Sequence, residues 1–538
     1  MSDKLFSRET VPTKLFINNE WTESKASQRL TLLNPKDDSP ISSDVHAAGE
    51  QDVDLAVEYA KTAFEEGPWS TFTGEQRAKC LNKLADLIDA HAEEIGYLES
   101  ICSGRLVSMT TGEISRVTSV FRYYAGWADK IKGDSYAADD GFYKIVRPEP
   151  LGVCVGITAW NASLHFLSWK SAPALACGNT MIIKASEKSP LGTLAIGYLI
   201  KEAGFPPGVF QIVNGGGLTG ALLAAHMNVA KISFTGSIGT GKKIQEAATK
   251  SNLKRVTLEL GGKSPAIVFD DAVFEKAIFW SMMGITINSG QVCAASSRLY
   301  VQEGIAEKFI GALKAQFDQI GQGLGADPQE NTTMYGPLVD KGQHDRVLSY
   351  IEEGKKEAKL VAGGTPNKGP GQYISPVIFL DPTDDASVYK EEIFGPVLCI
   401  KTFKTEEEVL RMANNSTYGL AGSVFTQDVS RAFRVSSKLH GGSIGVNCAM
   451  MVGPQVPMGG FKQSGYGREL GEYALRHYTE PKSIWFRAEE LGLALVEPKI
   501  ILDTGMYQID DPRCIAVEDT MCCQPAFMQE IYGAIHPE

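Results

Sequence analysis

The sequence has no apolar stretch long enough to cross a membrane and no run of basic residues. Its 538 residues carry a net charge of −12, and the Lys and Arg side chains are dispersed. This argues against nucleic acid or an anionic membrane as the main partner. The residues that follow Met1 contain neither an apolar signal core nor an Arg-rich presequence, so we expect a cytoplasmic protein.

Cysteine is scarce, and its spacing excludes two classes of protein. The ten cysteines show neither the pattern of a disulfide framework nor that of a zinc site, and most stand in apolar surroundings typical of a reducing compartment. Cys514, Cys522, Cys523 and His536 are poorly spaced for a metal, so we expect no metal site. Internal repeats and low-complexity tracts are absent. The 43% hydrophobic content is typical of a globular protein with ample chain for more than one core.

The first 150 residues read as scaffold. Residues 16–21 predict a hairpin, and 52–64 carry the apolar stripe of a helix. Thr73 and Gln76 resemble a capping box that opens a long helix with apolar positions as far as Ile95. We assign no chemistry to these elements.

From residue 150 the pattern changes to apolar strands that alternate with helical segments. The expected strands are 153–157, 180–184, 209–213, 232–235 and 256–260, and the expected helices are 164–176 and 191–203. Such alternation predicts a parallel sheet covered by helices, with ligands beyond the carboxyl ends of its strands. A second α/β stretch follows, with strands expected at 265–269, 298–301, 423–425 and 443–446 and a helix at 306–319.

A glycine-rich turn and a Lys-Glu pair fall at two of these strand ends. Gly236-Ser-Ile-Gly-Thr-Gly241 precedes a helix expected at 242–250, where a helix N-terminus suits a pyrophosphate. Its spacing differs from GxGxxG, and a plain tight turn is the alternative. Glu187 is suited to accept ribose hydroxyls and to repel a 2′-phosphate, with Lys184 beside it, which favours NAD; Lys188 offsets part of that repulsion. The alternative is a solvated pair.

Three residues suited to covalent chemistry stand far apart in the chain. Cys293 follows the apolar run 279–287 in a cluster of small residues, where a thiol acts as a nucleophile or remains inert and buried. Glu259 ends an apolar strand, so burial is expected to raise its pKa toward that of a general base; a structural carboxylate is the alternative. Asn161 offers amide N–H donors for an oxyanion, or caps its own loop.

Several short motifs occur in order between about residues 15 and 486. They are Asn161, Lys184-Ala-Ser-Glu187, Phe234-Thr-Gly-Ser237, Leu258-Glu-Leu-Gly-Gly-Lys263, Gly290-Gln-Val-Cys293, Glu391-Glu-Ile-Phe-Gly-Pro396 and Pro457-Met-Gly-Gly-Phe-Lys462. This ordered set resembles the successive signatures of the NAD(P)-dependent aldehyde dehydrogenase superfamily. The resemblance implies an α/β fold of the aldehyde dehydrogenase type, with a Rossmann-type NAD-binding domain, an α/β catalytic domain and a β oligomerisation hairpin.

The same resemblance implies roles for individual residues. Cys293 is the expected nucleophile, Glu259 the general base and Asn161 the oxyanion donor, beside the Cys293 backbone N–H. Glu469 matches an acidic position associated with proton relay; a helix-terminus carboxylate is the alternative. NAD is the expected cofactor, with NADP as the alternative. The expected cofactor-binding residues are Thr158, Trp160, Lys184, Glu187, Gly217, Phe234, Gly236, Ser237, Gly241, Leu260, Glu392 and Phe394.

The sequence departs from the family pattern around the expected aldehyde tunnel. After Asn161 the family usually carries an aromatic residue and a proline, where this chain has Ala162 and Ser163. Methionines also replace aromatics that are common in acetaldehyde and betaine-aldehyde enzymes. We therefore predict a wide apolar tunnel for a bulky or aromatic aldehyde and a low preference for quaternary ammonium. The expected substrate-binding residues are Ala162, Phe166, Trp169, Val292, Met450, Met451, Val452 and Met458.

The resemblance also divides the chain. The expected NAD-binding domain is 1–127 with 150–261, the catalytic domain 262–461, the oligomerisation segment 128–149 with 473–487, and the C-terminal extension 488–538. A homodimer or homotetramer is expected. The extension receives no role.

The predicted reaction is NAD-dependent oxidation of an aldehyde to the carboxylic acid. It proceeds through a Cys293 thiohemiacetal and thioester, which Glu259-activated water hydrolyses. The alternatives are a cysteine-dependent acyl-transferring or esterase enzyme and a non-catalytic NAD-binding scaffold. Glu259 argues against the CoA-acylating branch of the family, and the presence of Cys293, Glu259 and Asn161 together argues against the scaffold.

Overall fold

The structure is a computed structural model that describes residues 11–364, 369–449, 451–487, 514–517 and 520–523. The chain divides into two compact units. The larger comprises Met1–Asp134 and Val146–Ser483, and the smaller comprises Ser135–Ile145 and Ile484–Glu538. No described helix is both long enough and apolar enough to span a bilayer.

The larger unit contains an eight-stranded sheet whose central strands are parallel. Its strands, in spatial order, are β19 (Gly465–Tyr466), β11 (Arg255–Glu259), β10 (Lys231–Thr235), β7 (Val153–Ile157), β8 (Thr180–Ala185), β9 (Phe210–Asn214), β1 (Leu15–Ile17) and β2 (Glu20–Thr22). The five strands from β11 to β9 are parallel, and the strands outside them are antiparallel. All five expected strands and the N-terminal hairpin are present. The chain reverses its direction of winding at β7, where such sheets bind ligands.

The strands that come directly before and after Cys293 in the chain belong to a second sheet, which has seven strands. Its strands, in spatial order, are β14 (Lys359–Ala362), β15 (Val377–Leu380), β16 (Val397–Phe403), β13 (Arg298–Gln302), β12 (Pro265–Val268), β17 (Ala421–Phe425) and β18 (Ser443–Val446). Only β14 is antiparallel to its neighbour. The central strands are buried on both faces, so they read as continuous apolar runs rather than as alternating ones. The predicted parallel α/β architecture is confirmed.

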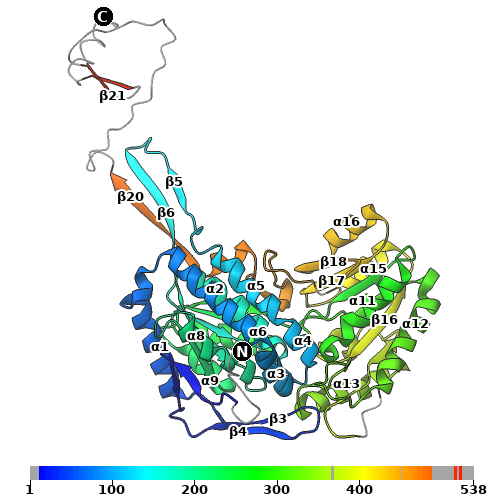
Figure 1. The fold of residues 1–538 in the computed structure, drawn as a ribbon. Coiled ribbons are helices and arrows are strands. Elements are labelled where there is room, and N and C mark those ends of the chain that lie inside the picture. Colours follow the sequence, from blue (N-terminus) through cyan, green and yellow to red (C-terminus); the bar gives the residue numbers. More distant parts are fainter. Residues whose placement is uncertain (1–10, 365–368, 450, 488–513, 518–519, 524–538) are drawn as a thin grey trace, which may run out of the picture. The chain divides into compact units, whose positions relative to one another are not determined.

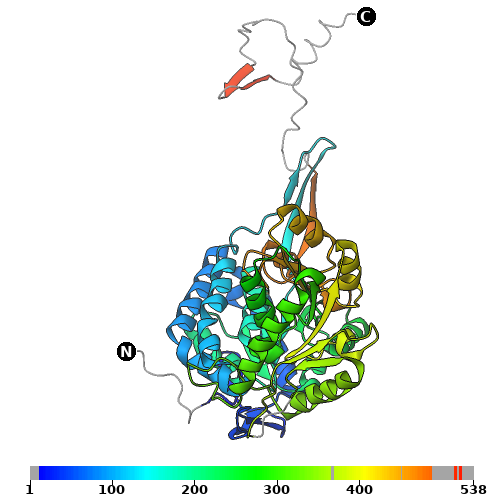
Figure 2. The same cartoon turned by 90° about the vertical axis from the view of Figure 1, so that its right-hand side faces the viewer.

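Two groups of helices cover these sheets (Figure 1). Around the first sheet are α1 (Glu50–Glu65), α2 (Gly74–Ala90), α3 (Ala92–Ser103), α4 (Val107–Gly112), α5 (Ile114–Ala125), α6 (Ser163–Ala176), α7 (Leu191–Ala195), α8 (Gly197–Glu202), α9 (Gly217–Ala225) and α10 (Ile238–Lys250). Around the second are α11 (Phe274–Thr286), α12 (Glu303–Gln322), α13 (Lys341–Glu357), α14 (Ser387–Lys390), α15 (Glu406–Asn414) and α16 (Val429–Lys438). Figure 2 shows the blue-to-cyan helices and the yellow helices on opposite sides of this unit.

The short elements lie between these. They are β3 (Arg29–Leu33), β4 (Pro40–His46) and the 3₁₀ turns η1 (Pro68–Thr71), η2 (Trp160–Ala162), η3 (Ile287–Gly290), η4 (Lys462–Ser464) and η5 (Glu472–His477). Strands β5 (Asp134–Tyr136), β6 (Phe142–Pro150) and β20 (Thr479–Arg487) form a three-stranded sheet. In the smaller unit, Phe142 packs edge-on against Trp485, and β21 (Cys514–Val517) pairs with β22 (Thr520–Cys523).

Three helices differ from their predicted limits. The capping box at Thr73 is present, but the helix predicted to continue as far as Ile95 ends at Ala90, because His91 leaves the helical region with φ −113° and ψ 24°. The helix expected at 191–203 is likewise divided, at Ile196. The third, expected at 242–250, begins at Ile238. That last difference changes how the glycine-rich turn is interpreted.

Candidate active site

The candidate residues of the first sheet gather at the carboxyl ends of its parallel strands. Thr158, Trp160 and Asn161 follow β7, while Lys184 lies in β8 and Glu259 ends β11. The Thr158 N–H donates to the Lys184 carbonyl, 3.2 Å away, so two of these strand ends are joined directly. A similar bond, 3.1 Å long, joins the residue after β10 to Glu259. The predicted common edge is therefore present.

The Lys184–Glu187 pair is partly withdrawn from solvent. Lys184 is buried, and its Nζ donates to Glu187 at 3.3 Å. Burial lowers the pKa of Lys184. The Glu187 side chain is 43% exposed, which leaves its second oxygen available to a ligand. Lys188, which was expected to offset the charge of Glu187, instead pairs with Asp340 at 2.6 Å.

The glycine-rich segment is the first turn of α10 rather than a loop that precedes a helix. Ser237 is the N-cap, and its hydroxyl accepts from the Thr240 N–H at 3.3 Å. The interpretation of 236–241 as a separate phosphate-binding loop is therefore wrong in its local structure, because Ser237 caps the helix four residues earlier than expected. A Cβ on Gly239 would meet no atom within 4 Å, and the same holds for Gly217 at the start of α9. Open space thus lies beside two helix N-termini.

Two packed contacts complete this edge. A Cβ at Gly241 would lie 2.9 Å from the Leu260 side chain, so α10 approaches β11 closely. The rings of Trp160 and Phe394 are 5.3 Å apart and nearly perpendicular, which joins the loop after β7 to the segment before β16. Phe234, in β10, is buried.

Cys293 follows a segment of unusual backbone. Asn288, Ser289 and Gly290 all have positive φ, of 49°, 52° and 75°. A Cβ at Gly290 would lie 2.2 Å from the Gly395 carbonyl oxygen, so only glycine fits there. Left-handed non-glycine residues are costly and gather at functional sites. Cys293 itself is only partly buried.

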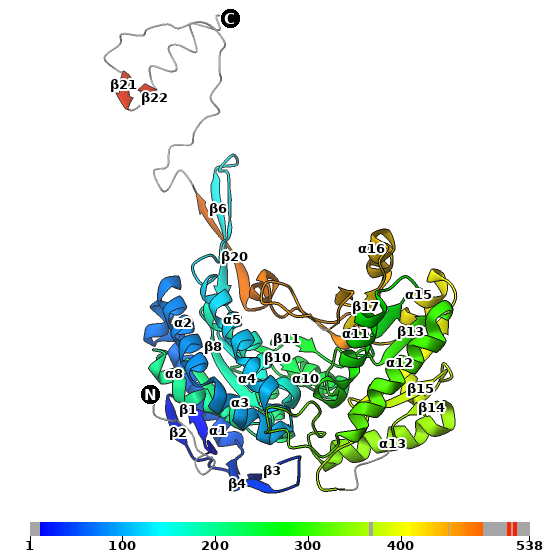
Figure 3. The ribbon, with the colours of Figure 1, turned by 45° about the vertical axis from the view of Figure 1, so that its right-hand side comes forward.

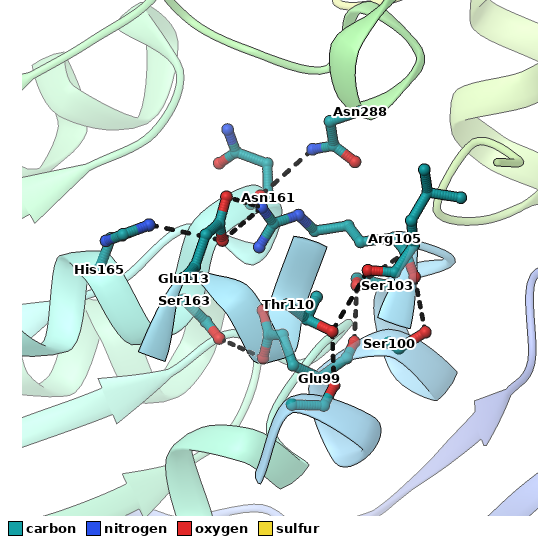
Figure 4. A network of polar contacts seen from close by, with 12 residues as sticks. Glu99, Ser100, Ser103, Arg105, Thr110, Glu113, Asn161, Ser163, His165 and Asn288 are labelled. Atoms are coloured by element: carbon teal, nitrogen blue, oxygen red, sulfur yellow. Dashed lines mark hydrogen bonds and ion pairs between the residues drawn. The ribbon is translucent and has the colours of Figure 1, made fainter. Parts of the chain in front are cut away.

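Asn161 and the Cys293 segment are held together by side-chain amides. Asn161 Nδ2 donates to the Gln291 carbonyl at 3.0 Å. Asn288 Nδ2 donates to that same carbonyl and to the Asn161 carbonyl, both at 3.2 Å. Because an amide nitrogen carries two N–H groups, Asn161 retains a second donor while its first binds the Gln291 carbonyl, two residues before Cys293. Figure 4 shows Asn288 directed toward Asn161.

Glu259 is a buried carboxyl group, 3% exposed. Neither of its oxygens accepts a hydrogen bond from an N–H or O–H group of the described residues, and the Cys293 thiol is the nearby donor that affects its pKa. Burial, with the negative charge of Glu469, raises the pKa of Glu259 to about 8, although Lys170 and the Cys293 thiol lower it. The expected rise in its pKa is confirmed. Figure 3 shows β10 and β11 facing the helix that leads to Cys293.

Burial, reinforced by Glu259 and Glu392, raises the pKa of the Cys293 thiol well above its usual range. The group is therefore a thiol in this state, and it requires a base to become a nucleophile. Glu392 accepts from the Gly262 N–H at 3.0 Å, and burial raises the pKa of Glu392 to about 7. A Cβ on Gly262 would lie 2.4 Å from the Cys293 carbonyl oxygen, so this glycine permits the close approach.

Glu469 lies in an extended bridge opposite Met458, not at a helix end, so the helix-terminus alternative is wrong. Its carboxylate forms an ion pair with Lys170 and accepts from the Ser233 hydroxyl at 3.0 Å. Lys170 also donates to Thr235 at 2.8 Å. Glu469, Met458 and Glu259 line one small cavity.

The expected substrate residues separate into a buried and an exposed group. Phe166 and Trp169 are buried with their rings 5.5 Å apart, and Val292 packs on the same cluster as Ala162. Met458 is 5% exposed. Met451 and Val452 are 64% and 47% exposed, so neither is buried in an apolar wall. Met450 lies outside the described residues.

Sequence reasoning missed three polar residues of this site. Asn288 and Gln291 lie inside the motif around Cys293 but were given no role, although a polar pair before a nucleophile is a signal. Gln291 Oε1 accepts from the Val339 N–H at 2.9 Å, which fixes the loop from its other side. Lys170 is the only Lys, Arg, Asp or Glu residue of α6, and a fully buried lysine is rarely found without a partner.

The described residues contain no group of three or more His, Cys, Asp or Glu side chains arranged to hold a metal ion. The geometry brings a thiol, a carboxyl group of raised pKa and an amide donor to the edge of a parallel sheet with open helix N-termini. Such a set of groups suits an enzyme that combines thiol chemistry with a nucleotide-type sheet.

Comparison with known proteins agrees with this class. The family model described as "Aldehyde dehydrogenase family" matches residues 21–484. An aldehyde dehydrogenase of Davidiella tassiana is 46% identical over 90% of this chain and 96% of its own, and aldehyde dehydrogenase 1A1 of Gallus gallus is 46% identical over 88% and 93%. The chain therefore belongs to the aldehyde dehydrogenase family, as predicted from its motifs.

Solved structures give the same result. The aldehyde dehydrogenase of Bacillus cereus in complex with NAD+ is 42% identical, with a TM-score of 0.86 over 88% of this chain and 96% of that one. A mutant of P. syringae AldA indole-3-acetaldehyde dehydrogenase, in complex with NAD+ and IAA, is 36% identical, with a TM-score of 0.86 over 89% and 97%. The predicted aldehyde dehydrogenase fold is confirmed, and the chain is an enzyme of this class.

Proposed function

We propose that the protein oxidises an aldehyde to the carboxylic acid with NAD, using Cys293, Glu259 and Asn161. The observation that carries the proposal is the buried, unpartnered Glu259 carboxyl group beside the Cys293 thiol. A carboxylate kept without donors and with a pKa near neutrality suits a general base. The Asn161 amide and the Cys293 backbone N–H suit the oxyanion that forms when the thiolate attacks a carbonyl.

The residues of the first sheet edge fit NAD. The open space at Gly217 and Gly239 lies beside helix N-termini that favour a pyrophosphate, and Glu187 keeps an exposed carboxylate oxygen for ribose hydroxyls. Trp160, Phe394 and Glu392 stand on the side nearest the nucleophile. Because Lys188 is engaged by Asp340, it offers little to a 2′-phosphate, which supports NAD over the alternative NADP. When bound, NAD supplies the acceptor of the hydride.

In the protein's own steps, Glu259 takes the thiol proton, and the Cys293 thiolate attacks the aldehyde carbon to give the alkoxide form of a thiohemiacetal. Asn161 stabilises the alkoxide oxygen. The alkoxide reforms its C=O bond as the hydride leaves, which gives a Cys293 thioester, and Glu259 releases the thiol proton to solvent. Glu259 then takes a proton from the water that attacks the thioester and returns a proton to the departing Cys293 sulfur, so that the acid and the free thiol are released.

Replacement of Cys293 by Ala tests this proposal most directly. We expect no aldehyde-dependent NADH formation, with NAD binding and the unfolding temperature close to wild type, measured by absorbance, calorimetry and thermal unfolding. NADH formation by the wild type without CoA separates oxidation from acyl transfer. NADH formation that persists in the alanine variant contradicts the proposal. If the wild type binds NAD but forms no NADH with any aldehyde, the scaffold alternative holds.

We propose further that the substrate is bulky, aromatic or apolar. The support is the buried Phe166–Trp169 pair beside the small Ala162, and the IAA complex of the P. syringae relative. The exposed Met451 and Val452 give no support. A panel of aldehydes of graded size, assayed by NADH formation, is expected to give higher kcat/KM for benzaldehyde-type and long-chain substrates. Acetaldehyde or betaine aldehyde far ahead of these contradicts the preference.

The assembly and location are also proposals. Strands β5, β6 and β20 support the predicted oligomerisation segment and hence a homodimer or homotetramer, and the two sheets support the predicted domain limits. A cytoplasmic location is supported by the relative named "Aldehyde dehydrogenase, cytosolic 1" of Macroscelides proboscideus, 46% identical.

A further inference from the structure

A buried carboxyl group outside the proposed machinery holds the start of the helix that follows Asn161. The Ser163 hydroxyl donates to Glu99 Oε2 at 2.6 Å, and Figure 4 shows the two side chains directed toward each other. Ser163 is the first residue of α6, and Glu99 belongs to α3. Their exposed fractions are 0% and 1%, so this is a fully dehydrated contact.

The contact involves one carboxyl oxygen of Glu99 and the Ser163 hydroxyl. Burial raises the pKa of Glu99 to about 7, while the positive charge of Arg105 and the hydrogen bonding of Ser163 lower it. The other oxygen, Oε1, has no partner. A Cβ on Gly192 would lie 2.8 Å from Glu99 Oε2, so glycine makes room for the carboxyl group on α7.

Within the part of the chain that the structure describes, the N-cap position of α6 has no side-chain cap of its own. The N-cap residue Ala162 has φ −158° and ψ 53° and makes no capping hydrogen bond. The preceding turn, η2, carries Asn161, whose Nδ2 reaches Gln291 two residues before the nucleophile. The position of the Asn161 amide therefore depends on its own hydrogen bond to Gln291 and on the hydrogen bond that anchors Ser163, two residues further along the chain.

We propose that Glu99 and Ser163 form a positioning pair that fixes the oxyanion-stabilising amide of Asn161. This inference rests on the proposed function of Asn161. Neither residue of the pair touches the reacting atoms in this arrangement. They act because a donor displaced by about 1 Å from a developing oxyanion loses much of its effect on rate.

The test is a double-mutant cycle between Ser163→Ala and Asn161→Ala, measured by the kcat of aldehyde oxidation. We expect Ser163→Ala to lower kcat about five- to tenfold in the wild-type background and to change it less than twofold in the Asn161→Ala background. The KM for NAD and the rate of Cys293 alkylation by iodoacetamide stay within twofold. Ser163→Thr, which keeps the hydroxyl, restores kcat.

Ser100→Ala is the matched control. Its hydroxyl is equally buried and makes a bond of the same length, 2.6 Å, to the Arg105 carbonyl, one residue along α3 from Glu99. We expect it to lower the unfolding temperature by a similar amount to Ser163→Ala and to leave kcat within twofold. A crystal structure of Ser163→Ala is expected to lengthen the 3.0 Å bond from Asn161 to Gln291.

Three outcomes overturn the pairing: an equal loss of kcat from Ser163→Ala in both backgrounds, an equal loss of kcat in Ser100→Ala, or an unmoved Asn161 in the crystal. A wild-type protein without aldehyde oxidation refutes the proposed function instead. The crystallographic measurement still decides whether Ser163 holds Asn161 in place.

Discussion

Glu259 and Glu469 line the same cavity, and both are buried, yet their surroundings are opposite. Glu469 is neutralised by Lys170 and accepts from a serine hydroxyl. Glu259 has no donor at either oxygen and feels the charge of Glu469. A buried carboxyl group without a partner is costly, and its proton stays on until higher pH.

The difference separates two uses of a buried acid. An ion-paired carboxylate is held in place by its partner, whereas an unpaired carboxyl group with a pKa near neutrality exchanges its proton readily. The chain thus carries an ion-paired acid next to an unpaired one, although Glu469 Oε2 also lacks a partner among the described residues. The ion-paired acid raises the pKa of its neighbour by charge.

Among the variants that test this contrast, Glu259→Gln is expected to have the largest effect. We expect kcat to fall by a factor of about 10² to 10⁴, because an amide cannot remove a proton. In the wild type, activity is expected to be lost as pH falls below about 8, where Glu259 becomes protonated. Steady-state kinetics across pH provides the measurement. A variant with wild-type kcat assigns the base elsewhere.

The same substitution has an effect on stability of known sign. Because the folded-state pKa of Glu259, about 8, exceeds the ordinary value of 4.5, the folded state holds the proton more strongly than the unfolded state does. The resulting stabilisation is present below pH 4.5 and is lost as pH rises to 8. The unfolding free energy of Glu259→Gln should lack this decline, and Glu469→Gln serves as the ion-paired comparison.

A smaller change is expected from Lys170→Met, which removes the ion-pair partner of Glu469. An uncompensated buried carboxylate should reduce the unfolding free energy by roughly 3–5 kcal/mol. Since Lys170 lowers the pKa of Glu259, its loss should also move the acidic limb of the pH–rate profile upward.

Glu469→Gln provides the charge-matched control, because it removes the group that raises that pKa and should move the limb downward. If Lys170→Met and Glu469→Gln both shift the acidic limb of the pH–rate profile in the same direction, the electrostatic link between Glu259 and Glu469 is contradicted. Chemical denaturation and pH–rate profiles measure the two effects separately.

Much of the fold could be predicted because its strands are continuous apolar runs and because their order follows the chain. Strands β7 to β11 fall at the expected residues, and Glu259 is found at its strand end with the expected rise in pKa. The breaks in the helices at His91 and Ile196 could not be predicted, since neither residue is a proline or an obvious helix cap.

The features of the site that the sequence did not predict depend on distant contacts. The partner of Glu469 lies 299 residues away in α6, and periodicity carries no information on such a pairing. Met451 and Val452 looked like tunnel residues from their type alone, but apolar residues also occur at the surface. Ser237 was read as part of a loop because a serine before glycines suits both a turn and an N-cap.

Strand β19 has a consequence for how the protein is made. It pairs with β11, with Tyr466 opposite Leu258, and the Leu260 N–H donates to the Ser464 carbonyl at 2.9 Å. These partners are separated by some two hundred residues, so the ribosome must deliver nearly the whole chain before that border of the first sheet is covered. Until then β11 is an open edge strand, and the nascent polypeptide carries Glu259 on a border that is available for pairing with other chains.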